Sequence, residues 1–238
     1  YKNFHLKNAS WAMFIKNQIL KVTQFVAERG GGAVNTDFVL DVPNQNLMSG
    51  NLSLNNVRVK KDAWNGLVYG LNDGFVTLNM DFNTDAASFY DMLNKLSGSG
   101  NIIIENPEIK GWNFGPIYDD LETRKSADGI KPFIQINLAK GATNFDSLKS
   151  EFSLDNGAFN FKDAVFAAQE YDISANIKGN LDSWTLGAEF AANVKNVSRP
   201  SQFSFVMDGD LNAPSLDVDV SKLSGFYENK IKKKTEEV

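Results

Sequence analysis

Along most of the chain, apolar and polar residues alternate one by one. This alternation is typical of a β-strand that has one buried face and one face in water. It recurs in the runs Phe38–Val42, Leu52–Leu54, Val76–Phe82, Ile134–Leu138, Phe152–Leu154, Phe159–Phe161, Tyr171–Ile177, Leu186–Phe190, Phe203–Met207 and Leu216–Val220. The pattern predicts about twelve antiparallel strands.

Clusters of Asn, Asp and Gly separate several of these runs. Residues 72–74 and 155–157 read Asn-Asp-Gly and Asp-Asn-Gly, and we expect both to form tight hairpin turns, because these residue types tolerate a positive φ. Residues 179–180 and 208–210 are expected to separate strands in the same way. The polar stretch 122–131 predicts a loop at a seam between two halves of one sheet.

Two stretches show a helical period instead. Over residues 10–29 the apolar positions recur at steps of four and three, so we expect an amphipathic helix with Ser10 as its N-cap and the glycines 30–32 at its end. The positions that carry this stripe are Trp11, Ile15, Ile19, Val22 and Val26. A second, shorter helix is expected over residues 85–96.

Weak internal repetition links the segments 51–59, 101–114 and 151–161. Each is interpreted as a strand, an Asn-containing turn and another strand, which favours a repetitive meander. Two short helices cannot cover about a dozen strands, so the sheet must close as a barrel, fold into a sandwich or form an open trough. Short runs and scattered Phe residues disfavour an outer-membrane barrel.

We therefore expect an α+β fold, mostly antiparallel β, with a curved or rolled, trough-like sheet, one N-terminal amphipathic helix and a second short helix. The chain is interpreted as a single domain over 1–238, with the sheet at about 34–222. Residues 228–238 are expected to be a polar, solvated tail. The absence of an initiator Met at Tyr1 suggests the C-terminal part of a longer chain.

Composition excludes many kinds of chemistry. The chain has no Cys and only one His, His5, and its net charge is −5. Thiolate chemistry is impossible, and the negative charge argues against nucleic acid as a partner. The cluster Asp208, Asp210, Asp217 and Asp219 suggests calcium, but its members alternate with apolar strand residues or flank a turn, so we expect no metal and no cofactor.

Abundant carboxylates leave an acid–base pair possible in principle, although no catalytic motif is present. The 27 Asn residues suit turns and a wet face, and the 18 Phe residues suit a face without polar groups. No apolar run approaches the roughly 18 residues of a spanning helix. We expect a protein that is not an enzyme.

Three segments resemble the AsmA-like C-terminal region. Residues 96–104 and 109–113 read LSGSGNIII and IKGWN, residues 145–161 read FDSLKSEFSLDNGAFNF, and residues 207–214 read MDGDLNAP. Their order along the chain matches that of the family. The resemblance implies a periplasmic protein of Gram-negative bacteria that takes part in outer-membrane biogenesis and phospholipid transport. It also implies attachment to the inner membrane through a segment upstream of this chain.

The expected function is to bind or conduct phospholipid acyl chains, or those of another lipid, along a hydrophobic β-sheet groove. Inner- or outer-membrane proteins are possible further partners. The residues expected to line the groove are Val76, Leu78, Met80, Ile134, Ile136, Ile173, Ile177, Leu186, Phe203 and Phe205. The alternative is a structural or adhesin-like β module whose apolar face is fully buried.

Overall fold

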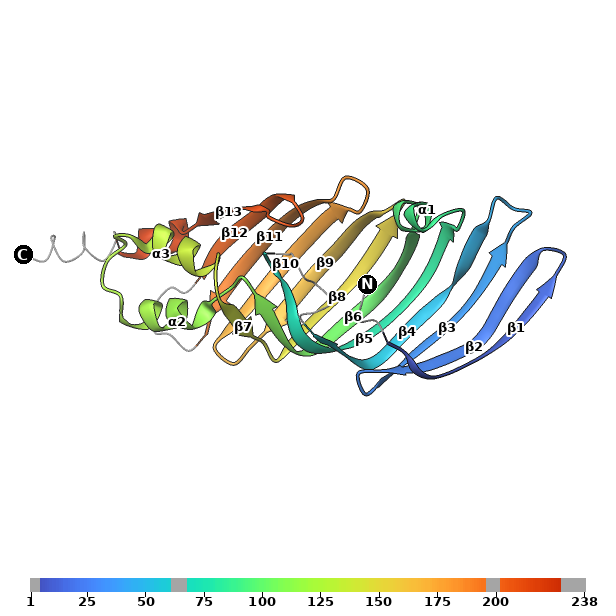
Figure 1. The fold of residues 1–238 in the computed structure, drawn as a ribbon. Coiled ribbons are helices and arrows are strands. Elements are labelled where there is room, and N and C mark those ends of the chain that lie inside the picture. The colour runs from blue at the N-terminus through green and yellow to red at the C-terminus, as the bar shows by residue number, and fades with distance from the viewer. Residues whose placement is uncertain (1–4, 61–67, 196–201, 228–238) are drawn as a thin grey trace, which may run out of the picture.

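The fold is dominated by one antiparallel sheet of 13 strands, seen in a computed structural model that describes residues 5–60, 68–195 and 202–227 (Figure 1). Strands that follow one another along the chain are neighbours in the sheet, except that β7 pairs only with β6. The sheet is open, because its edge strands β1 and β13 do not pair with each other, and it is not strongly curled. A closed barrel and a rolled sheet are therefore not found in the described part of the chain.

The strands of the first half are long. They are β1 (Lys7–Lys16), β2 (Ile19–Arg29), β3 (Gly32–Asp41), β4 (Leu47–Lys60), β5 (Gly70–Asp85) and β6 (Ser97–Lys110). The second half contains β7 (Ala142–Asn144), β8 (Ser147–Asp155), β9 (Ala158–Ala167), β10 (Tyr171–Asn180), β11 (Thr185–Val194), β12 (Gln202–Asp210) and β13 (Ser215–Asp219). The helices are α1 (Phe89–Asn94), α2 (Phe114–Thr123), α3 (Ile130–Asn137) and a helix at 221–227.

The helix expected over residues 10–29 is wrong, because this segment forms the hairpin β1–β2. Asn17 and Gln18 make its turn with φ of 51° and 63°. Within β2, the left-handed residue Gln24 (φ 57°) produces a β-bulge, and the bulge shifts the alternation by one residue. Val22 and Val26, which are four residues apart and lie on either side of the bulge, are on opposite faces of the strand, although their spacing imitates a helical step.

The strand expected over Ile134–Leu138 is also wrong, because these residues belong to α3 or follow it. Ile130 and Ile134, four residues apart, are buried on one face of the helix. The expected loop at 122–131 overlaps the end of α2 and the start of α3. Helix α2 was not expected, although its buried residues Phe114, Ile117 and Leu121 have a helical spacing.

The turn at residues 155–157 is confirmed between β8 and β9, where Asn156 and Gly157 have positive φ. The turn expected at 72–74 is wrong, because these residues lie inside β5 at register shifts against β6. Asn, Asp and Gly therefore mark bulges in this sheet as well as turns. The polar tail at 228–238 lies outside the described residues.

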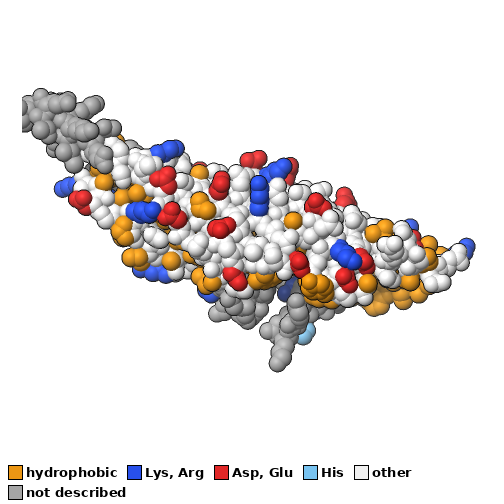
Figure 2. Space-filling model, turned by 90° about the horizontal axis from the view of Figure 1, so that it is seen from above, with side chains coloured by type: hydrophobic (Ala, Val, Ile, Leu, Met, Phe, Trp, Pro, Cys, Tyr) orange, Lys and Arg blue, Asp and Glu red, His pale blue; other side chains and the backbone are white. Residues whose placement is uncertain are grey.

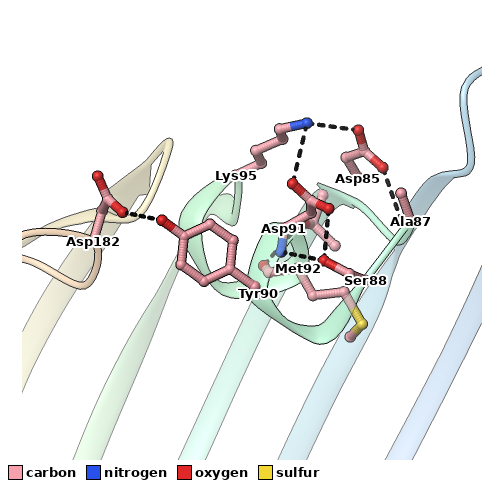
Figure 3. Close-up of polar contacts among 9 residues, drawn as sticks. Asp85, Ala87, Ser88, Tyr90, Asp91, Met92, Lys95 and Asp182 are labelled. Atoms are coloured by element: carbon pink, nitrogen blue, oxygen red, sulfur yellow. Dashed lines mark hydrogen bonds and ion pairs between the residues drawn. The ribbon is translucent and has the colours of Figure 1, made fainter.

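Helix α1 is shorter than the expected 85–96 and begins after the N-cap Ser88, whose hydroxyl accepts from the Asp91 N–H. Two neighbouring side chains hold this helix against the end of β5 (Figure 3). The Lys95 ammonium lies 2.8 Å from Asp85, and the Thr84 hydroxyl donates to the Met92 carbonyl at 2.8 Å. The helix is thus fixed at one end of the strands.

Left-handed bulge residues recur on every second strand of the sheet from β2 to β9. They are Gln24 on β2, Asn56 on β4, Asn106 on β6 and Asp163 on β9. In three cases the bulge N–H donates to a polar side chain on the next strand, as between Asn56 and Thr77. The interpretation of segments 51–59 and 101–114 as strand, turn and strand is wrong for this reason, because the central Asn forms a bulge within one strand. Only 151–161 spans a hairpin.

Candidate functional site

The main chemical feature of the molecule is an apolar face that crosses the whole sheet. Register places side chains of neighbouring strands directly opposite one another, so they lie on the same face. One row of opposed residues extends from β2 to β13 and consists of Phe25, Thr36, Leu52, Met80, Gly100, Phe152, Phe161, Ile177, Ala188, Met207 and Leu216. Thr36 is its only residue with a polar side-chain atom, and that hydroxyl donates to the Asn51 carbonyl.

Two further rows run beside the first one. Ala27, Val34, Leu54, Leu78 and Ile102 are opposed across β2 to β6. On the other side lie Val22, Phe38, Gly50, Phe82, Gly98, Leu154, Phe159, Gly179 and Leu186. Adjacent strands are about 4.8 Å apart, so the rows form a continuous apolar strip many strands wide.

In the C-terminal half, helices cover this face. The core there is built around Trp112, whose ring lies 5.1 to 5.5 Å from the rings of Phe166, Phe190 and Phe205. Phe114, Ile117 and Leu121 of α2, Ile130 and Ile134 of α3, and Leu223 and Tyr227 of the last helix complete the cluster. Here the apolar face is an ordinary protein core.

In the N-terminal half, no described residue of β1–β4 belongs to that core. Exposure of this face is uneven, because Val22 and Ala27 on β2 and Val34 on β3 are buried although they lie near the edge of the sheet. Val57 on β4 and Val76 on β5 are buried, Leu52 and Met80 are half-buried, and Trp11 on β1 is 56% exposed. We call the apolar-face side chains of β1–β6 that lie outside this core and its packing neighbours the open apolar face.

Glycines stand beside large side chains on this face. Phe82 on β5 stands between Gly50 on β4 and Gly98 on β6, which have no side chain to oppose it. A Cβ at Gly100 would lie 2.1 Å from the Asn79 carbonyl oxygen, so no other residue fits there without a shift of the backbone. Neighbouring strands therefore approach each other closely within the strip. The side chains of the strip on β1–β4 are not covered by the helical core.

The opposite face of the sheet carries many polar side chains, together with scattered exposed apolar residues such as Val165 and Val206. Ser53 donates to Asn79 at 2.8 Å, and Arg58 on β4 forms an ion pair with Asp73 on β5. The hydrogen bond from this guanidinium lowers the pKa of Asp73 to about 2. Figure 2 shows charged side chains scattered over the visible surface, while hydrophobic side chains lie at both ends of the molecule and along its lower rim. The sheet thus separates a wet face from an apolar one.

Helix α1 lies at one rim of the sheet. The Tyr90 hydroxyl donates to Asp182 in the β10–β11 turn at 2.7 Å, which raises the pKa of Tyr90 (Figure 3). Backbone hydrogen bonds connect the next turns along the same rim. The Gly157 N–H donates to the Leu96 carbonyl, and the Leu181 N–H donates to the Gly157 carbonyl. The rim therefore links the open half of the sheet to the covered half.

The predicted groove residues fall into three environments. Val76, Leu78 and Met80 lie on the open apolar face. Ile173, Phe203 and Phe205 lie in the helix-covered core, and Ile177 and Leu186 are half-buried beside it. Ile134 and Ile136 lie on α3, where Ile134 is fully buried and Ile136 is 57% exposed.

The sequence reasoning missed the apolar-face residues of β1 and β2, because it assigned this segment to a helix. They are Trp11, Met13, Ile15, Leu20, Val22, Phe25 and Ala27. The turn-forming pair Asn17-Gln18 and the alternation of Trp11, Met13 and Ile15 are the signals that could have identified them.

In the described part of the chain, no group of three or more His, Asp or Glu side chains is arranged to hold a metal ion. The acidic residues considered for calcium have separate local contacts. Asp217 lies 2.9 Å from Lys131, which lowers its pKa, while Asp210 and Asp219 accept from the N–H groups of Asn212 and Ser221.

None of the helices among the described residues is long and apolar enough to cross a bilayer. Comparison of the chain with protein-family models, curated proteins and solved structures finds no match.

Proposed function

We propose that the open apolar face binds the acyl chains of phospholipids or other lipids. The observation that carries this proposal is the unbroken row from Phe25 to Leu216, of which the part on β2–β6 is not covered by the helical core. Acyl chains need continuous apolar area, and each buried methylene contributes about 0.8 kcal/mol. They need no precisely placed polar group, in contrast to most small ligands.

The shape of the strip suits a long, flexible ligand. Side chains of successive strands repeat about every 4.8 Å across the sheet, so an extended chain that crosses several strands meets apolar atoms at each step. Met80 and the Phe82 ring supply adaptable and flat surfaces along this path. The lipid headgroup would remain in water beyond the rim of the sheet.

The cellular role belongs to the same proposal. The segments that resemble the AsmA-like C-terminal region fall on β6 and its flanking residues, on β8–β9, and on the end of β12 with the turn to β13, which lie in this order across the sheet. We accordingly propose a non-enzymatic protein of the periplasm, attached to the inner membrane by a segment upstream of this chain. Its role would lie in phospholipid transport to the outer membrane.

Two neighbouring residues on β5 give a matched test. Leu78 points to the open apolar face and Asn79, the next residue, lies exposed on the polar face. We expect phospholipid to co-purify with the protein in native mass spectrometry and a fluorescent fatty acid to bind in titration. Leu78→Glu should lower both signals at least tenfold, because it places a charge in the strip.

Asn79→Glu is the control and should bind as well as the wild type, since it adds the same charge to the wet face. Circular dichroism must show that both variants keep the sheet. If the folded wild type neither retains lipid nor binds fatty acid, the proposal is wrong.

A further inference from the structure

The two edges of the sheet are built differently. Strand β13 is short, and α3 covers it. The Gln135 amide donates to the Leu216 carbonyl at 3.1 Å, and Lys131 forms an ion pair with Asp217. Such cover is how proteins prevent a sheet edge from pairing with other chains. Strand β1, at the other edge, has ten residues, and all of them are exposed.

Strand β1 is also apolar on both of its faces. Trp11, Met13 and Ile15 continue the open apolar face, and they are 56%, 60% and 67% exposed. Phe14, on the other face, is 63% exposed. The backbone of β1 pairs with β2 on one side, and no other described strand pairs with β1. A long, flat, hydrophobic edge of this kind is a template for another strand.

The sequence of β1 suits antiparallel pairing with itself. A twofold axis at Met13 places Trp11 opposite Ile15 of the second copy on the apolar face and Ala12 opposite Phe14 on the other. Lys16 then lies opposite Ser10, so the two lysines of the strand do not oppose each other. A register with its twofold axis at the centre of the strand, between residues 11 and 12, would place Lys7 opposite Lys16. Like charges disfavour that register.

We propose that β1 pairs with β1 of a second copy of this chain, in the antiparallel register that centres on Met13. Directly opposite side chains share a face, so the open apolar face continues from one copy into the other. A twofold contact of this kind is closed, and it leaves the covered β13 strands as the edges of the joined sheet. The inference stands on the edge itself and does not depend on the identity of any ligand.

The lack of Cys makes the register directly testable. In Met13→Cys the only two thiols of the dimer would lie opposite each other, at about the Cβ separation that allows a disulfide. We expect mild oxidation to convert most of this variant to a covalent dimer on non-reducing gels. In Phe14→Cys, which is equally exposed, the thiols lie diagonally, about 7 to 8 Å apart at the backbone, so dimer should form at least tenfold more slowly.

Solution mass tests the contact without any thiol. Light scattering on delipidated wild type at tens of micromolar should give about twice 26.4 kDa, and Met13→Lys should give a monomer because two ammonium groups then oppose each other. Val206→Lys, on another exposed apolar residue, should stay a dimer. A monomeric wild type, or equal cross-linking of the two Cys variants, would overturn the inference.

The lipid proposal fails or succeeds separately. Leu78 lies on β5, away from β1, so the Leu78→Glu protein should lose bound lipid and keep the mass of a dimer. Loss of the dimer with retained lipid would reject only the edge contact, and the converse would reject only the lipid-binding face.

Discussion

The two halves of the sheet have the same alternation of apolar and polar residues, but helices cover the apolar face in only one of them. In β2–β6 the apolar face presents residues such as Leu52 and Met80, and in β9–β12 it presents Phe161, Ile177 and Met207 in the same row. In the second half α2, α3 and the helix at 221–227 pack over this face. In the first half the described residues leave most of it half-buried or exposed.

This difference shows that strand alternation alone does not define a core. Alternation places apolar side chains on one face, and a second layer then decides whether the face is dry. Here the second layer comes from the insertion of α2 and α3 between β6 and β7 and from the helix that follows β13. Three experiments test this difference, in the covering helices, in the two halves of the apolar face and on the polar face of the open half.

The largest effect is expected on the covering helix α3. Ile134→Lys places a charge where the wild-type side chain is fully buried, so it should lower the free energy of unfolding by at least about 3 kcal/mol. Ile136→Lys, two residues away on the exposed side, should change it by less than about 0.5 kcal/mol. Urea unfolding followed by circular dichroism measures both. Equal losses would mean that α3 does not pack on the sheet as described.

A second comparison matches two Phe residues on the same face. Phe205→Ala removes a ring that is 1% exposed and stacks on Phe190 at a centroid distance of 4.5 Å. It should cost about 3 to 5 kcal/mol of stability. Phe82→Ala, in the open half, should cost about half as much or less, because its ring is already partly in water.

Thermal and urea unfolding of lipid-free protein measure this second difference. A loss in Phe82→Ala as large as that in Phe205→Ala would show that the open half is as dry as the covered half. In that case the apolar face would be core over its whole length.

The smallest effect is expected from the ion pair between Arg58 and Asp73 on the polar face of the open half. The pKa of Asp73 is about 2 in the folded protein and near 3.8 ordinarily, so the pair stabilises the fold above pH 4. That contribution is lost as the pH falls from about 4 to about 2. Arg58→Gln should therefore remove part of the loss of stability in this interval. Both side chains are more than a third exposed, so the change is small.

The reference for that measurement is the stability of the wild type at pH 5 and at pH 2. If Arg58→Gln loses as much stability between these two values as the wild type does, Asp73 does not titrate in contact with Arg58.

Much of the fold could be predicted from alternation, because strands with one wet face have a period of two. The runs around Phe38, Leu78, Phe152, Ile173 and Phe205 all fall on strands. The errors occurred where a second pattern overlaps the first. The bulge at Gln24 interrupts the alternation of β2, and Ile134 and Ile136 alternate with polar residues although they lie on helix α3.

The candidate site was predictable only in part for the same reason. Val76, Leu78 and Met80 could be assigned to an apolar strand face, whereas Ile173 and Phe205 have the same pattern and lie under helices. No local signal distinguishes them, because cover depends on segments far away in the chain.

The sequence by itself determined that this protein is a meander of antiparallel strands with one apolar face and one polar face, since side-chain direction follows from the period of the backbone. Only the tertiary structure decided which part of that face is core and which part is open. Packing of α2, α3 and the last helix depends on contacts between residues far apart in sequence, and no local period encodes them. The same packing protects the edge at β13 and leaves β1 exposed.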